Sequence, residues 1–137
     1  MTTVVVDASV VIKWFVPEAG SDAARRLLAG ENLYAAPDLL FVEVANVAWK
    51  KVRRGHLSER HASQLVSEIS NIAIAAVPCR DLAPDAYALA HSTGQTVYDS
   101  MYLALALRLD TFVVTADERF VRAVAVIPDL APHLRLL

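Results

Sequence analysis

Short apolar runs alternate with longer segments of helical spacing along the whole chain. The first run, Val4–Val6, is continuously apolar, which is typical of a strand buried on both faces of a parallel sheet. Predicted strands cover residues 3–6, 33–36, 72–77, 111–115 and 134–137. The spacing between them predicts helices over 9–15, 23–28, 39–53, 58–70, from 81 or 84 to 93, over 101–107, and finally through 121 and 124. This alternation predicts an α/β fold with a central, mostly parallel sheet of about five strands.

Polar residues and glycines mark the ends of several of these helices. The expected N-caps are Ser9, Ser21 or Asp22, Asp38 and Ser58, and the expected stops are Gly30, Gly55 and Gly94. The segment 39–53 is apolar almost all round, which predicts burial on most of its sides. Its polar positions are spaced by three or four residues and form one stripe: Glu43, Asn46, Lys50 and Arg53.

The composition fits a single domain, residues 1–137, with a large core. The hydrophobic share of 55% suits a sheet covered on both faces, or a chain that also buries surface against a partner. We therefore expect a homodimer, with Trp14, Phe15 and Trp49 among the contact candidates. Asp7 and Lys13 interrupt the first apolar segment, so neither a signal peptide nor a membrane span is expected. The single cysteine, Cys79, cannot form an internal disulfide, which favours a cytoplasmic location.

Four acids stand at positions where ligands are commonly bound. Asp7 and Asp117 follow predicted strands, Glu43 lies in the apolar helix, and Asp99 precedes the segment 101–107. They are separated by 43−7=36, 99−43=56 and 117−99=18 residues, so only the fold can bring them together. Clustered carboxylates repel one another unless cations neutralise them, and ligation by oxygen alone selects Mg²⁺ or Mn²⁺ over zinc. Such ions activate water and offset the charge that develops on a phosphodiester.

Each of these acids also has a purely structural explanation. Asp7, Asp99 and Asp117 can each serve as the N-cap of the helix that follows. Glu43 can lie on a solvent-facing stripe with Lys50 and Arg53. The metal hypothesis therefore depends on the four acids as a set.

Several segments together resemble the PIN-domain ribonucleases, above all the VapC toxins of toxin–antitoxin pairs. The segments are Asp7-Ala8-Ser9 after a valine strand, Glu43 in an apolar helix, Tyr98-Asp99-Ser100 leading into Tyr102-Leu103-Ala104-Leu105-Ala106, and Thr115-Ala116-Asp117-Glu118-Arg119-Phe120. The resemblance covers nearly the whole chain and implies an α/β/α sandwich that cuts RNA at an acidic pocket holding Mg²⁺ or Mn²⁺. By this likeness Asp7, Glu43, Asp99 and Asp117 are the catalytic acids. Asp7, Asp99 and Asp117 are the metal ligands, and Ser9 and Thr115 are supporting hydroxyls. It also implies a homodimer and a VapB-type antitoxin.

The basic residues and the rival enzyme classes complete the sequence-based expectations. Lys50, Arg53 and Arg54 belong to the one basic run and can hold RNA phosphate, although cations at a helix C-terminus also complement the helix dipole. A haloacid-dehalogenase-like phosphatase would need a second Asp two residues after Asp7, where Ser9 stands. A receiver domain would need an Asp after the strand 72–77, and the four histidines lie away from the strand ends. An inactive PIN-fold domain that binds RNA or protein stays an alternative.

Overall fold

Five parallel strands form the centre of the molecule, in the order β3-β2-β1-β4-β5. The structure is a computed structural model and describes residues 2–137. The strands are β1 (Thr2–Val6), β2 (Asn32–Pro37), β3 (Ile74–Val77), β4 (Val113–Thr115) and β5 (Leu134–Leu136). Every neighbouring pair is parallel, so the sheet is wholly rather than mostly parallel.

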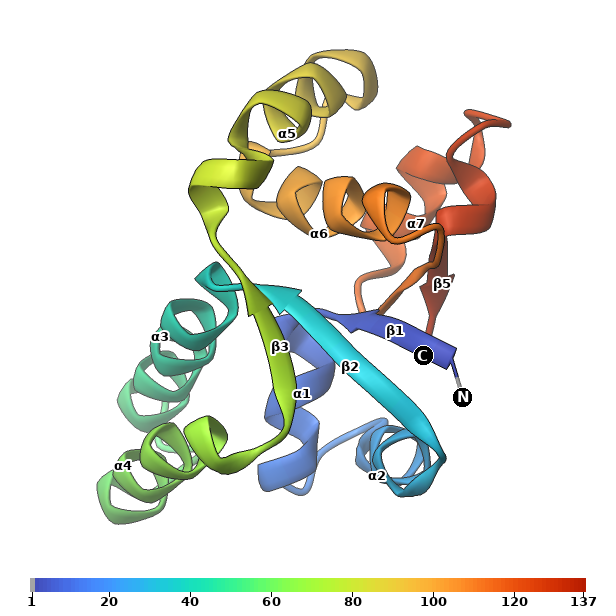
Figure 1. Ribbon diagram of the computed structural model, residues 1–137. Helices are drawn as coiled ribbons and strands as arrows, with labels where there is room; N and C mark the ends of the chain where they lie inside the picture. Colours follow the sequence, from blue (N-terminus) through green and yellow to red (C-terminus); the bar gives the residue numbers. More distant parts are fainter. Residues whose placement is uncertain (1) are drawn as a thin grey trace.

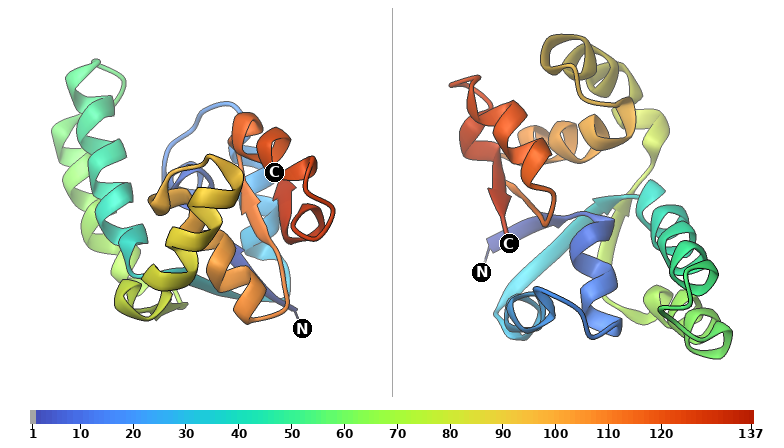
Figure 2. Two further views of the ribbon diagram at one scale, coloured as in Figure 1. Left: turned by 90° about the horizontal axis from the view of Figure 1, so that it is seen from above. Right: turned by 180° about the vertical axis from the view of Figure 1, so that it is seen from behind.

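Helices cover both faces of the sheet, as the α/β/α expectation requires (Figure 1). One side carries α1 (Ala8–Phe15), α2 (Ser21–Ala29), α3 (Leu39–Arg53) and α4 (Glu59–Glu68). The other side carries α5 (Cys79–Thr93), α6 (Val97–Arg108) and α7 (Glu118–Ala125), as the view from behind also shows (Figure 2). Two short 3₁₀ helices span Ile69–Asn71 and Ala131–His133. Among residues 2–137, no helix is long and apolar enough to cross a membrane.

The core joins the valines of β1 to α6. Val4, Val5 and Val6 are all buried, because β1 lies in the middle of the sheet with helices on both faces. On α6, every residue from Ser100 to Ala106 is buried, and the helix packs on β1, β2 and β4. The predicted central, apolar helix is therefore confirmed. Its packing fixes the start of α6 next to the ends of the central strands.

The strand pairing places the ends of β1 and β4 at the same edge of the sheet. Val6 of β1 is level with Val114 of β4, so the residues after the two strands leave the sheet side by side. Asp7 follows β1 directly, and Asp117 follows β4 after one intervening residue. Two of the four predicted acids are thus brought together by backbone hydrogen bonding alone.

Several helix ends differ from the sequence-based expectation. Asp7, not Ser9, caps α1, and Gly20 precedes α2 in a left-handed conformation with a φ of 86°. The helix α5 begins at Cys79 rather than at residue 81 or 84, because the carboxylate of Asp38 accepts a 3.0 Å hydrogen bond from the Cys79 amide. This cap comes from 41 residues earlier in the chain, so local sequence does not reveal it. Ser58 caps α4 as predicted.

The expected burial of α3 on most sides is wrong. Only Leu40, Val44 and Ala48 of this helix are buried, while the side chains of Val42 and Trp49 are 67% and 54% exposed. The reason is that α3 packs on α1 and α4 along one stripe and leaves the opposite side to solvent.

Of the two aromatic residues expected at a subunit contact on α1, Trp14 is turned inward. Its side chain is 8% exposed, and its indole Nε1 donates a 2.9 Å hydrogen bond to the carbonyl of Ala24. Trp14 therefore joins α1 to α2 and is unavailable for a subunit contact. Phe15 is partly buried against the core.

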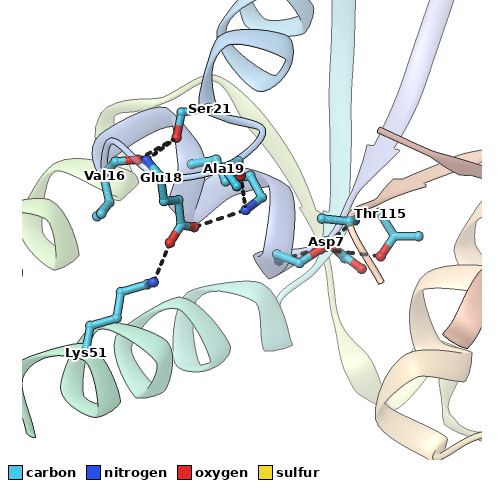
Figure 3. A network of polar contacts seen from close by, with 10 residues as sticks. Asp7, Val16, Glu18, Ala19, Ser21, Lys51 and Thr115 are labelled. Atoms are coloured by element: carbon cyan, nitrogen blue, oxygen red, sulfur yellow. Dashed lines mark hydrogen bonds and ion pairs between the residues drawn. The ribbon is translucent and has the colours of Figure 1, made fainter. Parts of the chain in front are cut away.

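An ion network centred on Glu18 ties α1 to α3. The carboxylate of Glu18 pairs with Nζ of Lys13 on α1, at 3.1 Å, and with Nζ of Lys51 on α3 (Figure 3). The three side chains are only 14–24% exposed, so screening by water is weaker than at an open surface. The network links the loop after α1 to the helix that carries Glu43.

We expect Glu18→Gln to lower the free energy of unfolding at pH 7 by about 1–2 kcal/mol, because it leaves two partly buried lysines facing a neutral amide. Burial works to raise the pKa of Glu18, but the hydrogen bonds and charges of Lys51 and Lys13 outweigh it and hold the pKa below its usual range. The contribution of Glu18 is therefore complete above the unfolded pKa and is lost as the pH falls through the folded pKa.

Denaturant titration at pH 7 and pH 3 measures this contribution. The matched control is Glu118→Gln, since Glu118 pairs with Arg122 at a site 69% exposed and should contribute less than about 0.5 kcal/mol. Equal effects of the two substitutions at pH 7 would show that the Glu18 network adds nothing to stability.

Candidate active site

All four predicted acids line one cavity at the carboxyl ends of the central strands. The cavity has a volume of about 180 Å³, and its lining residues are Asp7, Ala8, Ser9, Glu43, Val47, Asp99, Tyr102 and Asp117. A larger hollow of about 500 Å³ lies between α5 and α6, but its only charged lining residues are the ion-paired Asp85 and Arg108. The chemistry therefore points to the smaller cavity.

Asp7 is held at the floor of this cavity by the turn from β1 into α1. Its Oδ1 accepts a 3.0 Å hydrogen bond from the Ser9 amide and another from the Ser9 hydroxyl. The side chain is only 9% exposed, and this burial raises the pKa of Asp7 to about 6. The hydroxyls of Ser9 and Thr115 work against that rise, and the charge of Asp99 adds to it. The capping role and the cavity position are both real, so the two explanations of Asp7 are compatible.

The hydroxyls of Ser9 and Thr115 join the ends of β1 and β4 beside Asp7. Figure 3 shows Thr115 next to Asp7. Ser9 Oγ lies 3.4 Å from Thr115 Oγ1 and accepts a 2.9 Å hydrogen bond from the Ala116 amide, while Thr115 Oγ1 accepts one of 3.1 Å from the Asp117 amide. The two hydroxyls therefore order the loop that carries Asp117. They lie where the sequence-based hypothesis places supporting groups.

Asp99 is not the cap of α6, contrary to its structural explanation. Thr96 takes that role, because its hydroxyl accepts a 3.1 Å hydrogen bond from the Asp99 amide. The carboxylate of Asp99, in the first turn of the helix, lines the cavity instead. Burial raises the pKa of Asp99, the charge of Asp117 raises it further, and the bond with Thr96 lowers it. The charge of Asp117, from another helix, therefore acts on Asp99 across the cavity lining.

Glu43 faces the cavity rather than the solvent. It is half-buried, while Lys50 and Arg53 on the same helix are exposed, so the proposed solvent-facing stripe is wrong for Glu43. Its Oε1 accepts a hydrogen bond from the hydroxyl of Tyr102. Burial raises the pKa of Glu43, the bond from Tyr102 lowers it, and the charges of Asp7 and Asp99 raise it.

Asp117 caps α7 and lines the cavity at the same time. Its Oδ1 accepts hydrogen bonds of 3.0 Å from the Arg119 amide and 3.3 Å from the Phe120 amide. Unlike Asp7, it is exposed, so it stands at the mouth of the cavity. Both explanations of Asp117 again hold together, since a cap needs only one of the two carboxylate oxygens.

The cavity concentrates negative charge without a cationic side chain to balance it. Within residues 2–137, the ion pairs engage other acids, namely Glu18, Asp85 and Glu118. In the part of the chain that the structure describes, no histidine or cysteine lines the cavity, so its donors are carboxylate, hydroxyl and phenol oxygens. This donor set suits a hard cation such as Mg²⁺ or Mn²⁺.

The carboxylates do not yet converge on one point. No three His, Cys, Asp or Glu side chains of residues 2–137 are close enough together to hold a metal ion. Hydrogen bonds hold three of these acids, with Ser9 on Asp7, Tyr102 on Glu43 and the α7 amides on Asp117. Each of these bonds engages one carboxylate oxygen, so the chemistry of the donors still fits a cation.

Tyr102 is the one polar lining residue that sequence reasoning did not single out. It appeared only as part of the apolar segment that leads away from Asp99. Its spacing of three residues from Asp99 on a helix was the available signal, because residues at i and i+3 lie on the same face.

Comparisons with known proteins agree with this fold. Residues 4–126 match the model of the PIN domain family. The chain is similar to Ribonuclease VapC3 of Pyrobaculum aerophilum, with 38% identity over 117 residues that cover 84% of this chain and 89% of the relative.

Solved structures share the fold at lower identity. VapC20 of Mycobacterium tuberculosis, described as a toxin that cleaves the sarcin–ricin loop, aligns with a TM-score of 0.69 at 18% identity over 88% of this chain and 94% of that one. VapBC2 of Rickettsia felis, bound to a DNA fragment from its promoter, aligns with a TM-score of 0.63 at 15% identity over 98% of each chain. The family model, which spans far more than half of the sequence, shows that the chain belongs to the PIN domain family.

Proposed function

We propose that this protein is a metal-dependent endoribonuclease that hydrolyses RNA phosphodiester bonds at the four-acid cavity. The observation that carries the proposal is the gathering of Asp7, Glu43, Asp99 and Asp117 around one cavity without a cationic side chain from residues 2–137. Its relatives in the PIN domain family include proteins named ribonuclease, which supports this choice of reaction.

In this proposal Asp7, Asp99 and Asp117 hold Mg²⁺ or Mn²⁺. The bound cation supplies an activated water and offsets the negative charge that develops on the phosphodiester. Asp7 is the least exposed of the ligands and Asp117 the most exposed, so the substrate approaches from the side of Asp117. Glu43 faces the same cavity and accepts the proton of the attacking water. Ser9 and Thr115 keep Asp7 and the β4–α7 loop in place through their hydroxyls.

In this proposal RNA phosphates outside the cavity are bound by Lys50, Arg53 and Arg54. All three are exposed at the C-terminal end of α3. They follow Glu43 by seven to eleven residues, or about 10–16 Å along the helix axis, so they can contact phosphates beyond the one that is cut. Arg53 also lies over the ring of Trp49, 5.0 Å from its centroid, and this stacking orders its guanidinium.

We further propose that the protein is the toxin of a VapBC-type pair, with a cognate VapB-type antitoxin as its partner. The similarity to VapC3 and the shared fold with toxin–antitoxin assemblies support this assignment. A homodimer is also proposed, with the exposed Trp49 and the partly buried Phe15 still available as contact residues. The single cysteine accords with a reducing, cytoplasmic setting.

The principal alternative is an inactive PIN-fold domain that binds RNA or protein, and the structure lends it no specific support because none of the four acids is missing. A haloacid-dehalogenase-like phosphatase is disfavoured further by the structure. The position where that class needs a second acid holds Ser9, whose hydroxyl donates to Asp7 and accepts from the β4–α7 loop. This serine is fully engaged in holding the loop.

Activity should depend on a divalent cation and on the acids. We expect EDTA to abolish cleavage of single-stranded RNA and Mg²⁺ or Mn²⁺ to restore it. Asp99→Asn should lower kcat at least about 100-fold, because it removes a charged ligand without disturbing the Thr96 cap. The matched control is Asp22→Asn, an exposed acid in the first turn of α2. Full activity in excess EDTA, or equal activity of the two variants, would contradict the metal mechanism.

In the metal-free protein, the unpaired negative charge of Asp7 should lower the free energy of unfolding. Because the folded pKa of Asp7 is about 6 and its usual value is 3.8, ionised Asp7 destabilises the fold increasingly as the pH rises between these values. Asp7→Asn keeps a capping side chain and removes the charge, so we expect the free energy of unfolding at pH 7 to rise by up to about 3 kcal/mol.

Thermal or denaturant unfolding in EDTA at pH 4 and pH 7 tests this expectation. The gain should vanish at pH 4, where Asp7 is protonated when folded. Asp7→Ala serves as the comparison, because it removes the charge and the cap together and should gain less by about 0.5–2 kcal/mol. A clear loss of stability in Asp7→Asn at pH 7 would argue that this carboxylate is stabilising and not strained.

Expression of the protein alone should slow bacterial growth if it is a toxin. We expect Asp7→Asn to remove the growth defect and a co-encoded antitoxin to suppress it by tight binding. The measurement is growth after induction, with RNA cleavage by the purified protein determined in parallel. Normal growth despite proven cleavage activity would point to a housekeeping nuclease without a dedicated inhibitor.

A further inference from the structure

The side chain of Tyr102 connects the buried helix α6 to the cavity. Tyr102 is 1% exposed and is among the largest fully buried side chains of residues 2–137. Its hydroxyl reaches the cavity and donates to Oε1 of Glu43, which belongs to α3 and is 59 residues distant in sequence. The contact thus joins one helix from each side of the sheet (Figure 1).

This hydrogen bond fixes the orientation of the Glu43 carboxylate. The three aspartates of the cavity are already placed by the backbone. Asp7, Asp99 and Asp117 have short side chains, and the backbone of a strand end or a helix start places each of them. Glu43 lies in the middle of α3 and has one more rotatable bond, so its carboxylate can swing between the cavity and the solvent. The phenol holds one oxygen against the wall and leaves the other oxygen for the cavity.

The side chain of Tyr102 is itself held rigidly. A buried tyrosine hydroxyl needs a hydrogen-bond partner, and the ring of Tyr102 is fixed by the core packing of α6. Burial raises the pKa of Tyr102, and the neighbouring charge of Glu43 raises it further. The hydroxyl therefore stays protonated and acts only as a donor toward the carboxylate, so it is not a proton acceptor in its own right.

We propose that Tyr102 is a positioning residue of this active site, which turns Glu43 toward the cation and the attacking water. The proposal rests on the metal-dependent nuclease function proposed above. Tyr102 touches neither metal nor RNA in this scheme and acts only through Glu43. Its loss should therefore affect the binding of the cation and the chemical step more than the binding of RNA.

The test is Tyr102→Phe, which keeps the ring in the core and removes only the donor. The Kd for Mn²⁺ is measured on the full chain without RNA, by calorimetry or by electron paramagnetic resonance of free Mn²⁺. The charge of Glu43 adds to that of the three aspartates that hold the cation, and residues that orient the groups around a metal commonly contribute 10–100-fold, so we expect the Kd to rise about tenfold or more. With RNA at saturating Mn²⁺, kcat should fall about 10–100-fold while KM for RNA stays within about twofold.

Tyr34→Phe is the matched control. Tyr34 is also buried, at 6% exposure, and its hydroxyl donates to the carbonyl of Leu27, away from the cavity. This variant also loses a buried phenol hydrogen bond, although its acceptor is a backbone carbonyl rather than a carboxylate, so an effect of lost stability alone should appear in both variants. We expect Tyr34→Phe to lower the melting temperature and to leave the Kd for Mn²⁺ and kcat unchanged.

A double-mutant cycle with Glu43→Gln checks whether Tyr102 affects Mn²⁺ binding through Glu43. If Tyr102 acts only through Glu43, Tyr102→Phe causes no further loss of Mn²⁺ affinity once Glu43 is neutral. If Tyr102→Phe does not fold, Glu43→Asp replaces it, because the shorter side chain keeps the charge and withdraws from the phenol. We expect the same tenfold rise in Kd for that variant.

The outcomes separate this proposal from the proposed function. A rise in the Kd for Mn²⁺ of less than about threefold in Tyr102→Phe overturns the role of Tyr102, whatever the activity. Equal and additive losses in the Glu43→Gln background also overturn it, since Tyr102 would then act by another route. A wild-type protein that binds Mn²⁺ but cuts no RNA refutes the nuclease alone. A wild-type protein that does not bind Mn²⁺ overturns both.

Discussion

Repulsion among four carboxylates is the constraint around which this molecule is organised. Asp7, Glu43, Asp99 and Asp117 line one cavity of about 180 Å³, and burial with mutual repulsion raises the pKa of the first three. An arrangement of this kind costs folding free energy in the absence of a cation, because the carboxylates of Asp7, Glu43 and Asp99 lose water without gaining a cationic partner. The fold must therefore hold the acids in place with interactions formed elsewhere.

Those interactions come from three different levels of structure. The parallel pairing of β1 with β4 fixes Asp7 and Asp117 through the backbone. The buried face of α6 fixes Asp99, and the Glu18 network holds α3, which carries Glu43, against α1. Single hydroxyls then set the orientation of the carboxylates, with Ser9 on Asp7 and Tyr102 on Glu43. The hydroxyl groups near the cavity thus act mostly by positioning the carboxylates.

Much of the fold and of the candidate site could be predicted from local patterns. The valine run of β1, the apolar α6 and the acids at strand ends follow from rules on strand burial and on ligand position in α/β sheets. The predictions were wrong where residues distant in the sequence determine the local structure. The start of α5 depends on Asp38, the exposed face of α3 depends on where α1 and α4 pack, and the orientation of Glu43 depends on Tyr102. None of these partners is within reach of a local window of sequence.

The central claim is that the four acids form one cation-binding site, and the position of a bound ion tests it most directly. Crystals of the full chain soaked in Mn²⁺ would be measured near the manganese absorption edge, where anomalous scattering identifies the metal. The account predicts an anomalous peak in the cavity, with oxygens of Asp7, Asp99 and Asp117 at bonding distance from it. Mn²⁺ found only at other acids, such as Asp85 or Glu118, with none in the cavity at saturating concentration, would contradict it.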